Sequence, residues 1–91
     1  MLKTFLVAFD RLPDGAFQAR YAGRGWNCVK SSLVNGRSQK LVAHETGGAG
    51  YISLNFYRLS CGNTRLFPCE MSHEKVVRFV TECTVTDPPA R

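Results

Sequence analysis

The sequence predicts an α+β protein: an antiparallel sheet of five or six strands with one C-terminal helix packed on it. Three observations predict this fold class. Several short segments alternate apolar and polar residues, which is the period of a half-buried strand. Turn-forming Gly, Asn, Asp and Pro residues separate these segments. Near the C-terminus the apolar spacing becomes that of an amphipathic helix, so a helix should cover one layer of strands.

The N-terminal part is predicted to form a hairpin. Residues 2–9 carry apolar side chains on both faces, as expected of a well-buried strand. A turn follows at residues 12–15, where Pro presets φ and Gly accepts a positive φ. Phe17, Ala19 and Tyr21 then alternate with polar residues, which indicates a second strand with one face in water.

Residues 27–43 admit two interpretations. Asn35-Gly36 lies between segments 28–34 and 37–43, and this dipeptide between two strand-like runs is a strong hairpin signal. Asn27 could instead cap a short helix that ends at Gly36. We favour the hairpin, and residues 27–35 stay open between strand and helix.

The next segments are also strand-like. A Gly-rich connection at 46–50 leads to a strand at 51–59, whose apolar residues mark one face. Residues 61–63 turn the chain and residues 64–67 return. Pro68 cannot donate a ladder hydrogen bond, so this strand is expected to lie at an edge of the sheet or to end there.

The C-terminal helix is predicted from its cap and its apolar stripe. Ser72 has the residue type of an N-cap, and Glu74 places a negative charge in the first turn. Val76, Val80 and Cys83 follow at i, i+4 and i+7, which predicts a stripe facing the core.

Size and composition indicate one domain at residues 1–86 with a frayed tail at 87–91. Four cysteines occur without a Cys-x-x-Cys pair, so a zinc ribbon or thioredoxin-type site has no support. We expect buried thiols in a reducing cytoplasm; a disulfide between Cys61 and Cys69 across their turn is the alternative. The chain lacks an apolar run long enough for a membrane span, and its stretch at 5–9 is short for a signal peptide.

Positive charge is concentrated in one part of the chain. Of the net +5, residues 16–65 carry seven Lys or Arg against the single acid Glu45, a net +6, while residues 66–91 carry three bases against four acids. Basic surfaces attract anionic partners, and Arg and Lys contact phosphates. Gly23-Arg24-Gly25-Trp26 is predicted as a loop that offers a guanidinium fork and a stacking ring, although the Trp could equally fill the core. The predicted partner-binding residues are Arg20, Arg24, Trp26, Lys30, Arg37, Lys40 and Arg58.

Catalytic motifs are not evident, and no enzyme, cofactor or metal is predicted. His44 adjoins Glu45, but neighbours in a strand point to opposite faces. His73 is expected in the first helical turn, exposed to solvent. The glycines at 47–50 lack the Lys and Ser/Thr of a phosphate-binding loop. A small enzyme whose site is assembled in space is one rival interpretation.

In its small size, α+β layout, basic sheet and lack of catalytic motifs, the chain resembles phage-encoded anti-CRISPR proteins that inhibit the type I-F surveillance complex. The resemblance implies a non-catalytic inhibitor in the host bacterial cytoplasm that binds Cas subunits and blocks target DNA hybridisation. Many members are acidic and imitate DNA, whereas this chain is basic, which suits a site where guide RNA or the target DNA path is exposed. The alternative is a small basic nucleic-acid-binding module, such as a phage regulator.

Overall fold

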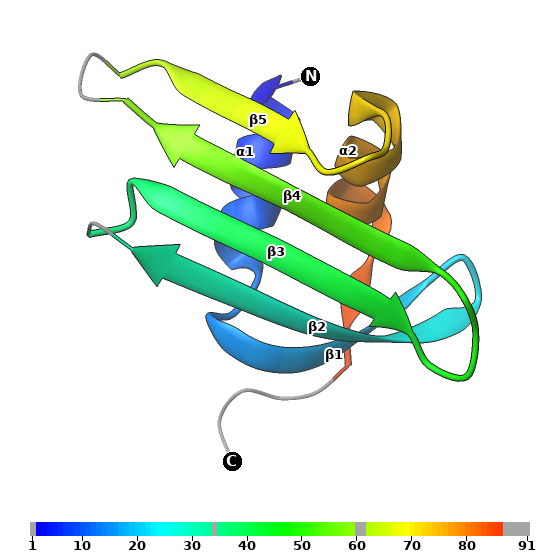
Figure 1. The fold of residues 1–91 in the computed structure, drawn as a ribbon. Helices are drawn as coiled ribbons and strands as arrows, with labels where there is room; N and C mark the ends of the chain where they lie inside the picture. The colour runs from blue at the N-terminus through cyan, green and yellow to red at the C-terminus, as the bar shows by residue number, and fades with distance from the viewer. Residues whose placement is uncertain (1, 34, 60–61, 87–91) are drawn as a thin grey trace.

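Six strands and two helices make up residues 2–33, 35–59 and 62–86, the part of the chain that the computed structural model describes (Figure 1). The strands form one antiparallel sheet in the order β5-β4-β3-β2-β1-β6, and both helices lie against the same face of it. The α+β class is therefore confirmed, with a second helix that was not predicted. The elements are α1 (Leu2–Arg11), β1 (Gly15–Tyr21), β2 (Arg24–Leu33), β3 (Ser38–Glu45), β4 (Tyr51–Arg58), β5 (Thr64–Pro68), α2 (His73–Glu82) and β6 (Thr84–Val85).

The N-terminal segment is the helix α1, so the prediction of a strand at residues 2–9 is wrong. Phe5, Phe9 and Leu12 recur at helical spacing and are buried, while Val7 is exposed. The rings of Phe5 and Phe9 lie 5.4 Å apart, and each lies 5.4 Å from the ring of Phe56 in β4. A short apolar run fits both periods, and it is packing on the sheet that selects the helix here.

The two tight turns around β2 set the register of the sheet. Tyr21 pairs with Arg24, so the turn consists of Ala22 and Gly23, both with positive φ, as a two-residue hairpin turn requires. The predicted loop at 23–26 is therefore wrong, because β2 already begins at Arg24 and includes Trp26.

The hairpin at Asn35-Gly36 is confirmed, and both residues have positive φ. The helix considered for residues 27–35 is wrong, since β2 runs to Leu33 and pairs with β3. The strand β5 lies at an edge and ends at Pro68, as predicted. Cys61 and the tail at 87–91 lie outside the described residues.

The helix α2 follows its predicted start. The Ser72 side chain accepts a hydrogen bond from a first-turn backbone N–H at 3.1 Å, so it is the N-cap. Val76 and Val80 are buried as expected, and Phe79 joins them. Cys83 is half-buried and forms the C-cap, after which β6 pairs with β1 at the other edge of the sheet.

Candidate functional site

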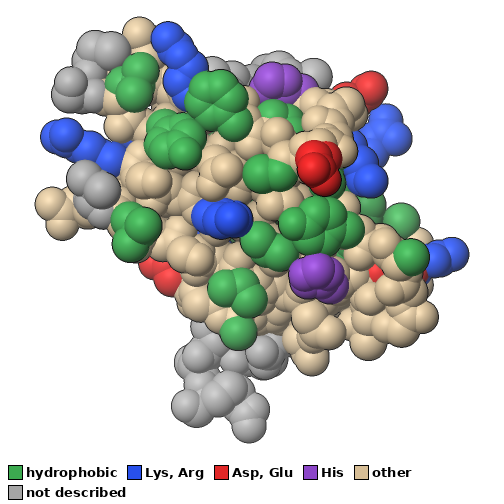
Figure 2. Space-filling model, in the orientation of Figure 1, with side chains coloured by type: hydrophobic (Ala, Val, Ile, Leu, Met, Phe, Trp, Pro, Cys, Tyr) green, Lys and Arg blue, Asp and Glu red, His purple; other side chains and the backbone are tan. Residues whose placement is uncertain are grey.

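The sheet has one face that no helix of the described part covers (Figure 1). We call it the open face. Figure 2 shows hydrophobic side chains spread across it among Lys, Arg and His side chains. Strand alternation and register place the following residues on it: Ala16, Gln18, Arg20, Gly25, Asn27, Val29, Ser31, Leu33, Ser38, Lys40, Val42, His44, Tyr51, Ser53, Asn55, Tyr57, Arg65, Phe67 and Thr84.

Large apolar side chains on the open face remain in contact with water. The exposed fractions are 48% for Val29, 66% for Leu33, 39% for Tyr51 and 53% for Phe67. A sheet face that meets only solvent normally carries polar residues. Apolar side chains gathered on one uncovered face are instead typical of an interaction surface.

Four of the ring-bearing side chains form two pairs. His44 of β3 lies opposite Tyr51 of β4, and their ring centroids are 5.0 Å apart. Tyr57 of β4 and Phe67 of β5 meet at 5.8 Å in an edge-to-face arrangement. The two aromatic pairs, as we call them below, come from neighbouring strands, so the sheet itself fixes their positions.

The charged strand positions of the open face are all basic, although Figure 2 also shows an acidic side chain in the same view. Arg20, Lys40 and Arg65 point outward, and none of the positions assigned to this face is Asp or Glu. Arg37 adds an exposed cation in the turn before β3. An excess of positive charge of this kind favours an anionic partner.

The prediction that Lys30 binds a partner is wrong. Its side chain points inward and is only 4% exposed. Its Nζ donates hydrogen bonds to the carbonyl oxygens of Phe9 at 2.7 Å and Leu12 at 3.0 Å, at the end of α1. Burial lowers the pKa of Lys30. This lysine therefore supports α1, and a partner cannot reach it.

Two of the predicted arginines are held by acids. Arg24 pairs with Glu45, and this guanidinium lowers the pKa of the Glu45 carboxyl. Arg58 pairs with Asp10 of α1 and also donates to Gln39 at 3.1 Å. Both arginines lie on the helix-covered side of the sheet by strand alternation, so neither belongs to the open face, although the Arg24 side chain is 67% exposed.

Trp26 fills the core, which was the alternative to a stacking role. Its ring lies 5.1 Å from the ring of Phe79 and 6.1 Å from that of Tyr21. Its Nε1 donates to the backbone oxygen of Tyr21 at 3.3 Å. Gly50 packs so closely against this ring that a Cβ would lie 2.7 Å from it. Of the seven predicted residues, Arg20, Arg37 and Lys40 keep exposed cations that form no ion pair within the described residues, whereas Arg24 is exposed but paired.

Sequence reasoning missed Arg65 and both aromatic pairs. The signal in the sequence was the set of alternate residues that face away from the core. In β3 to β5, aromatic and basic residues occupy these positions between the core residues.

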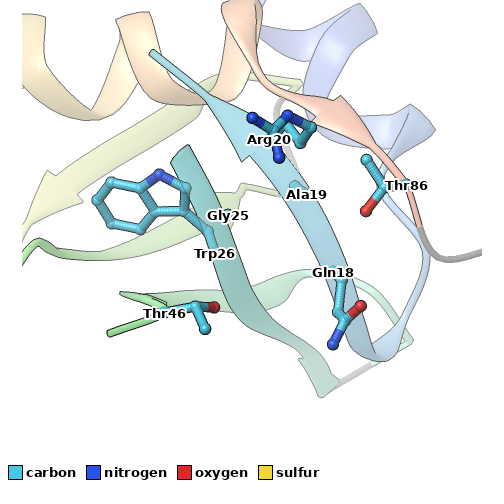
Figure 3. A pocket seen from close by; sticks show the side chains of 7 residues that line it. All are labelled: Gln18, Ala19, Arg20, Gly25, Trp26, Thr46 and Thr86. Atoms are coloured by element: carbon cyan, nitrogen blue, oxygen red, sulfur yellow. The ribbon is translucent and has the colours of Figure 1, made fainter. Parts of the chain in front are cut away.

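A hollow at one corner continues the open face (Figure 3). Its lining is Gln18, Ala19, Arg20, Gly25, Trp26, Thr46 and Thr86. Figure 3 shows that the Trp26 ring points away from Arg20 and Thr86. Arg20 donates to the backbone oxygen of Gly23 at 3.1 Å, and Thr46 accepts from Asn27 at 3.0 Å. The corner is therefore a polar rim for the face.

Two thiols and one histidine of the described part have surroundings that suit a structural role. Burial raises the pKa of the Cys28 thiol to about 12 and that of Cys83 to about 11, which disfavours the nucleophilic thiolate. His73 contacts the backbone oxygen of Leu66 at 2.9 Å. Among residues 2–33, 35–59 and 62–86, no three His, Cys, Asp or Glu side chains are grouped as metal ligands would be.

Helices α1 and α2 are both too short to span a membrane, and the described residues contain no other candidate. Comparisons with protein-family models, with curated proteins and with solved structures found no match.

Proposed function

We propose that the protein is a non-catalytic inhibitor that docks through its open face on a type I CRISPR surveillance complex and blocks hybridisation of target DNA. The observation that carries this proposal is the open face itself, which combines exposed apolar and aromatic side chains with cations and has no acid at its strand positions. Such a face suits a surface on which Cas protein and guide RNA lie together, because protein contacts bury the apolar part and phosphates attract the cations.

The open face is large enough for a specific complex. Six strands about 4.8 Å apart, with β3 and β4 eight residues long at about 3.3 Å per residue, give a face of roughly 24 Å by 26 Å. A partner that covers it buries about 1,200 Å² in total, above the roughly 1,000 Å² that a specific interface needs.

Inhibition by docking needs no chemistry from the protein. Aromatic and arginine side chains carry most of the energy in protein interfaces, and the open face supplies Tyr51, Phe67, Arg20 and Arg65. Its positive field speeds the encounter with an anionic complex. One bound copy then occupies the path that target DNA requires.

The alternative is a small basic nucleic-acid-binding module, and the two aromatic pairs favour it, since unpaired bases stack on such rings. It predicts tight, salt-sensitive binding to free nucleic acid without any Cas protein.

The proposed function is tested with the purified type I-F complex and a labelled target DNA. We expect DNA binding to disappear when the protein is added in equimolar amount or slight excess. Undiminished DNA binding at large excess would reject the function.

A matched pair of variants locates the docking face. Lys40→Glu reverses a charge in the middle of the open face, and Lys75→Glu makes the same change on exposed α2. We expect Lys40→Glu to weaken inhibition about tenfold or more, because it places an acid against an anionic partner. Lys75→Glu should inhibit as the wild type does. Equal potency of both variants would show that another surface docks.

A further inference from the structure

We propose that the open face binds single-stranded RNA, with unpaired bases stacked on the two aromatic pairs and the intervening phosphates close to Lys40. This inference rests on the proposed function and specifies what its docking face recognises. It concerns free RNA strands as well as an RNA exposed in a complex.

The aromatic pairs form two separate stacking positions on one sheet. Tyr51 and Tyr57 lie six residues apart on β4, which is about 20 Å along a strand. Their partners His44 and Phe67 are exposed, so each pair offers a ring surface to solvent. Proteins that bind single strands place successive bases on aromatic rings in this way.

The region between the pairs is suited to a ribose-phosphate backbone. Lys40 points outward there, opposite Asn55 of β4 on one side and Ser31 of β2 on the other. The ammonium can contact a phosphate, and the amide and hydroxyl can hydrogen-bond a ribose 2′-OH, the group that distinguishes RNA from DNA. Arg65 lies directly opposite Tyr57, beside the second aromatic pair.

The excess of cations at the strand positions of the open face favours a polyanion over a purely apolar partner. Phosphates meet no carboxylate at any outward strand position, and Arg20 extends the positive field toward the corner hollow. A protein partner would use the exposed Val29 and Leu33 as well as the rings. A single-stranded RNA would instead depend on the ring planes of Tyr51 and Phe67 for stacking.

The first experiment measures binding of the full chain to a fluorescent eight-nucleotide oligo(U) RNA by anisotropy. We expect tighter binding to this strand than to an RNA duplex or to oligo(dT) of equal length. Affinity should fall about twentyfold between 50 and 200 mM salt, as contacts from Arg20, Lys40 and Arg65 to about three phosphates predict. Binding of the duplex or of oligo(dT) as tight as that of oligo(U) would overturn the inference.

The second experiment replaces one ring in two ways. Tyr51→Phe keeps the ring, and Tyr51→Leu keeps an apolar side chain without it. We expect oligo(U) affinity within about twofold of wild type for Phe and roughly 5- to 150-fold weaker for Leu. Phe67→Leu should weaken oligo(U) binding as much as Tyr51→Leu does. Thermal unfolding verifies that each variant is folded. Leu variants that bind as tightly as the Phe variant would overturn stacking.

The two proposals fail separately. If the protein inhibits the surveillance complex but does not bind oligo(U), the face docks on protein, and the RNA inference is overturned while the proposed function stands. If it binds oligo(U) with the expected variant pattern and leaves target DNA binding intact, the RNA inference is supported and the proposed function is rejected.

Discussion

At the scale of single residues, the clearest result is the role of Lys30. Its ammonium satisfies two carbonyl oxygens at the end of α1 and lies 4.5 Å from the centre of the Phe9 ring. A positive charge is favourable at a helix C-terminus, where the carbonyls carry the negative end of the dipole. A lysine that contributes to the positive charge of the chain therefore joins α1 to the sheet.

Lys30→Met tests this role, because it keeps a long apolar side chain and removes the ammonium. We expect the free energy of unfolding in urea to fall by about 1–3 kcal/mol, since two buried carbonyls lose their partner. Lys40→Met, the same change at an exposed position, should stay within about 0.5 kcal/mol of wild type. Equal stability of both variants would contradict the structural role.

The ion pair of Arg24 and Glu45 predicts a dependence on pH. Because Arg24 lowers the pKa of Glu45 in the folded protein, the unfolded chain binds a proton at higher pH than the folded chain does. The stabilisation by this pair is therefore complete above the ordinary pKa of 4.5 and is lost as the pH falls through the lowered value. In Glu45→Gln the side-chain oxygen can still accept the hydrogen bond from the Gly50 backbone N–H, but the uncharged amide cannot form an ion pair with Arg24.

Urea midpoints of the wild type and Glu45→Gln check this prediction. We expect the wild type to have the higher midpoint at pH 7 and the difference to narrow toward pH 3. Arg24→Gln should show the same narrowing, because it removes the other partner. A difference that is constant over this range would argue against the pair.

At the scale of elements, each helix depends on a different kind of interaction. The helix α1 is held by its phenylalanines and by Lys30, whereas α2 begins at a side-chain cap. Three valines within α2 lower its intrinsic helix propensity, so the cap and the buried stripe must compensate.

Ser72→Ala measures the contribution of the cap. It removes the acceptor for the first-turn N–H, and we expect a loss of about 1 kcal/mol in chemical denaturation. Ser72→Gly should cost only a few tenths of a kcal/mol, because water and the flexible backbone replace the cap. The prediction is wrong if glycine costs as much as alanine.

At the scale of the whole molecule, the protein has two layers, and one side of the sheet is left uncovered. The core lies between the sheet and both helices, and the triangle of Phe5, Phe9 and Phe56 joins α1 to β4. A domain of this size has about 5–14 kcal/mol of stability in total, so one large core side chain is a substantial part of it.

Phe5→Ala tests the join between the layers. We expect a loss of about 3–5 kcal/mol in the free energy of unfolding, because the substitution leaves a cavity under α1. Val7→Ala lies on the exposed side of the same helix and should change stability by less than about 0.5 kcal/mol. Similar losses for both would mean that α1 does not pack as described.

The local pattern of the sequence was sufficient for most strands and for the start of α2. Asn35-Gly36 specifies a tight turn by its own backbone preferences, and Ser72 can satisfy a helix N-terminus without any distant contact. These features depend on residues a few positions apart, which is why the linear chain reveals them.

Packing determined the identity of α1 and the location of the candidate site. An apolar run at 2–9 fits a strand or a helix until Phe56 and the sheet select one. Likewise, net charge adds up lysines and arginines without regard to direction, so it counts Lys30 and Lys40 alike. Only the three-dimensional arrangement turns one of them into the core and the other onto the open face, because a side chain's partners depend on segments far away along the chain.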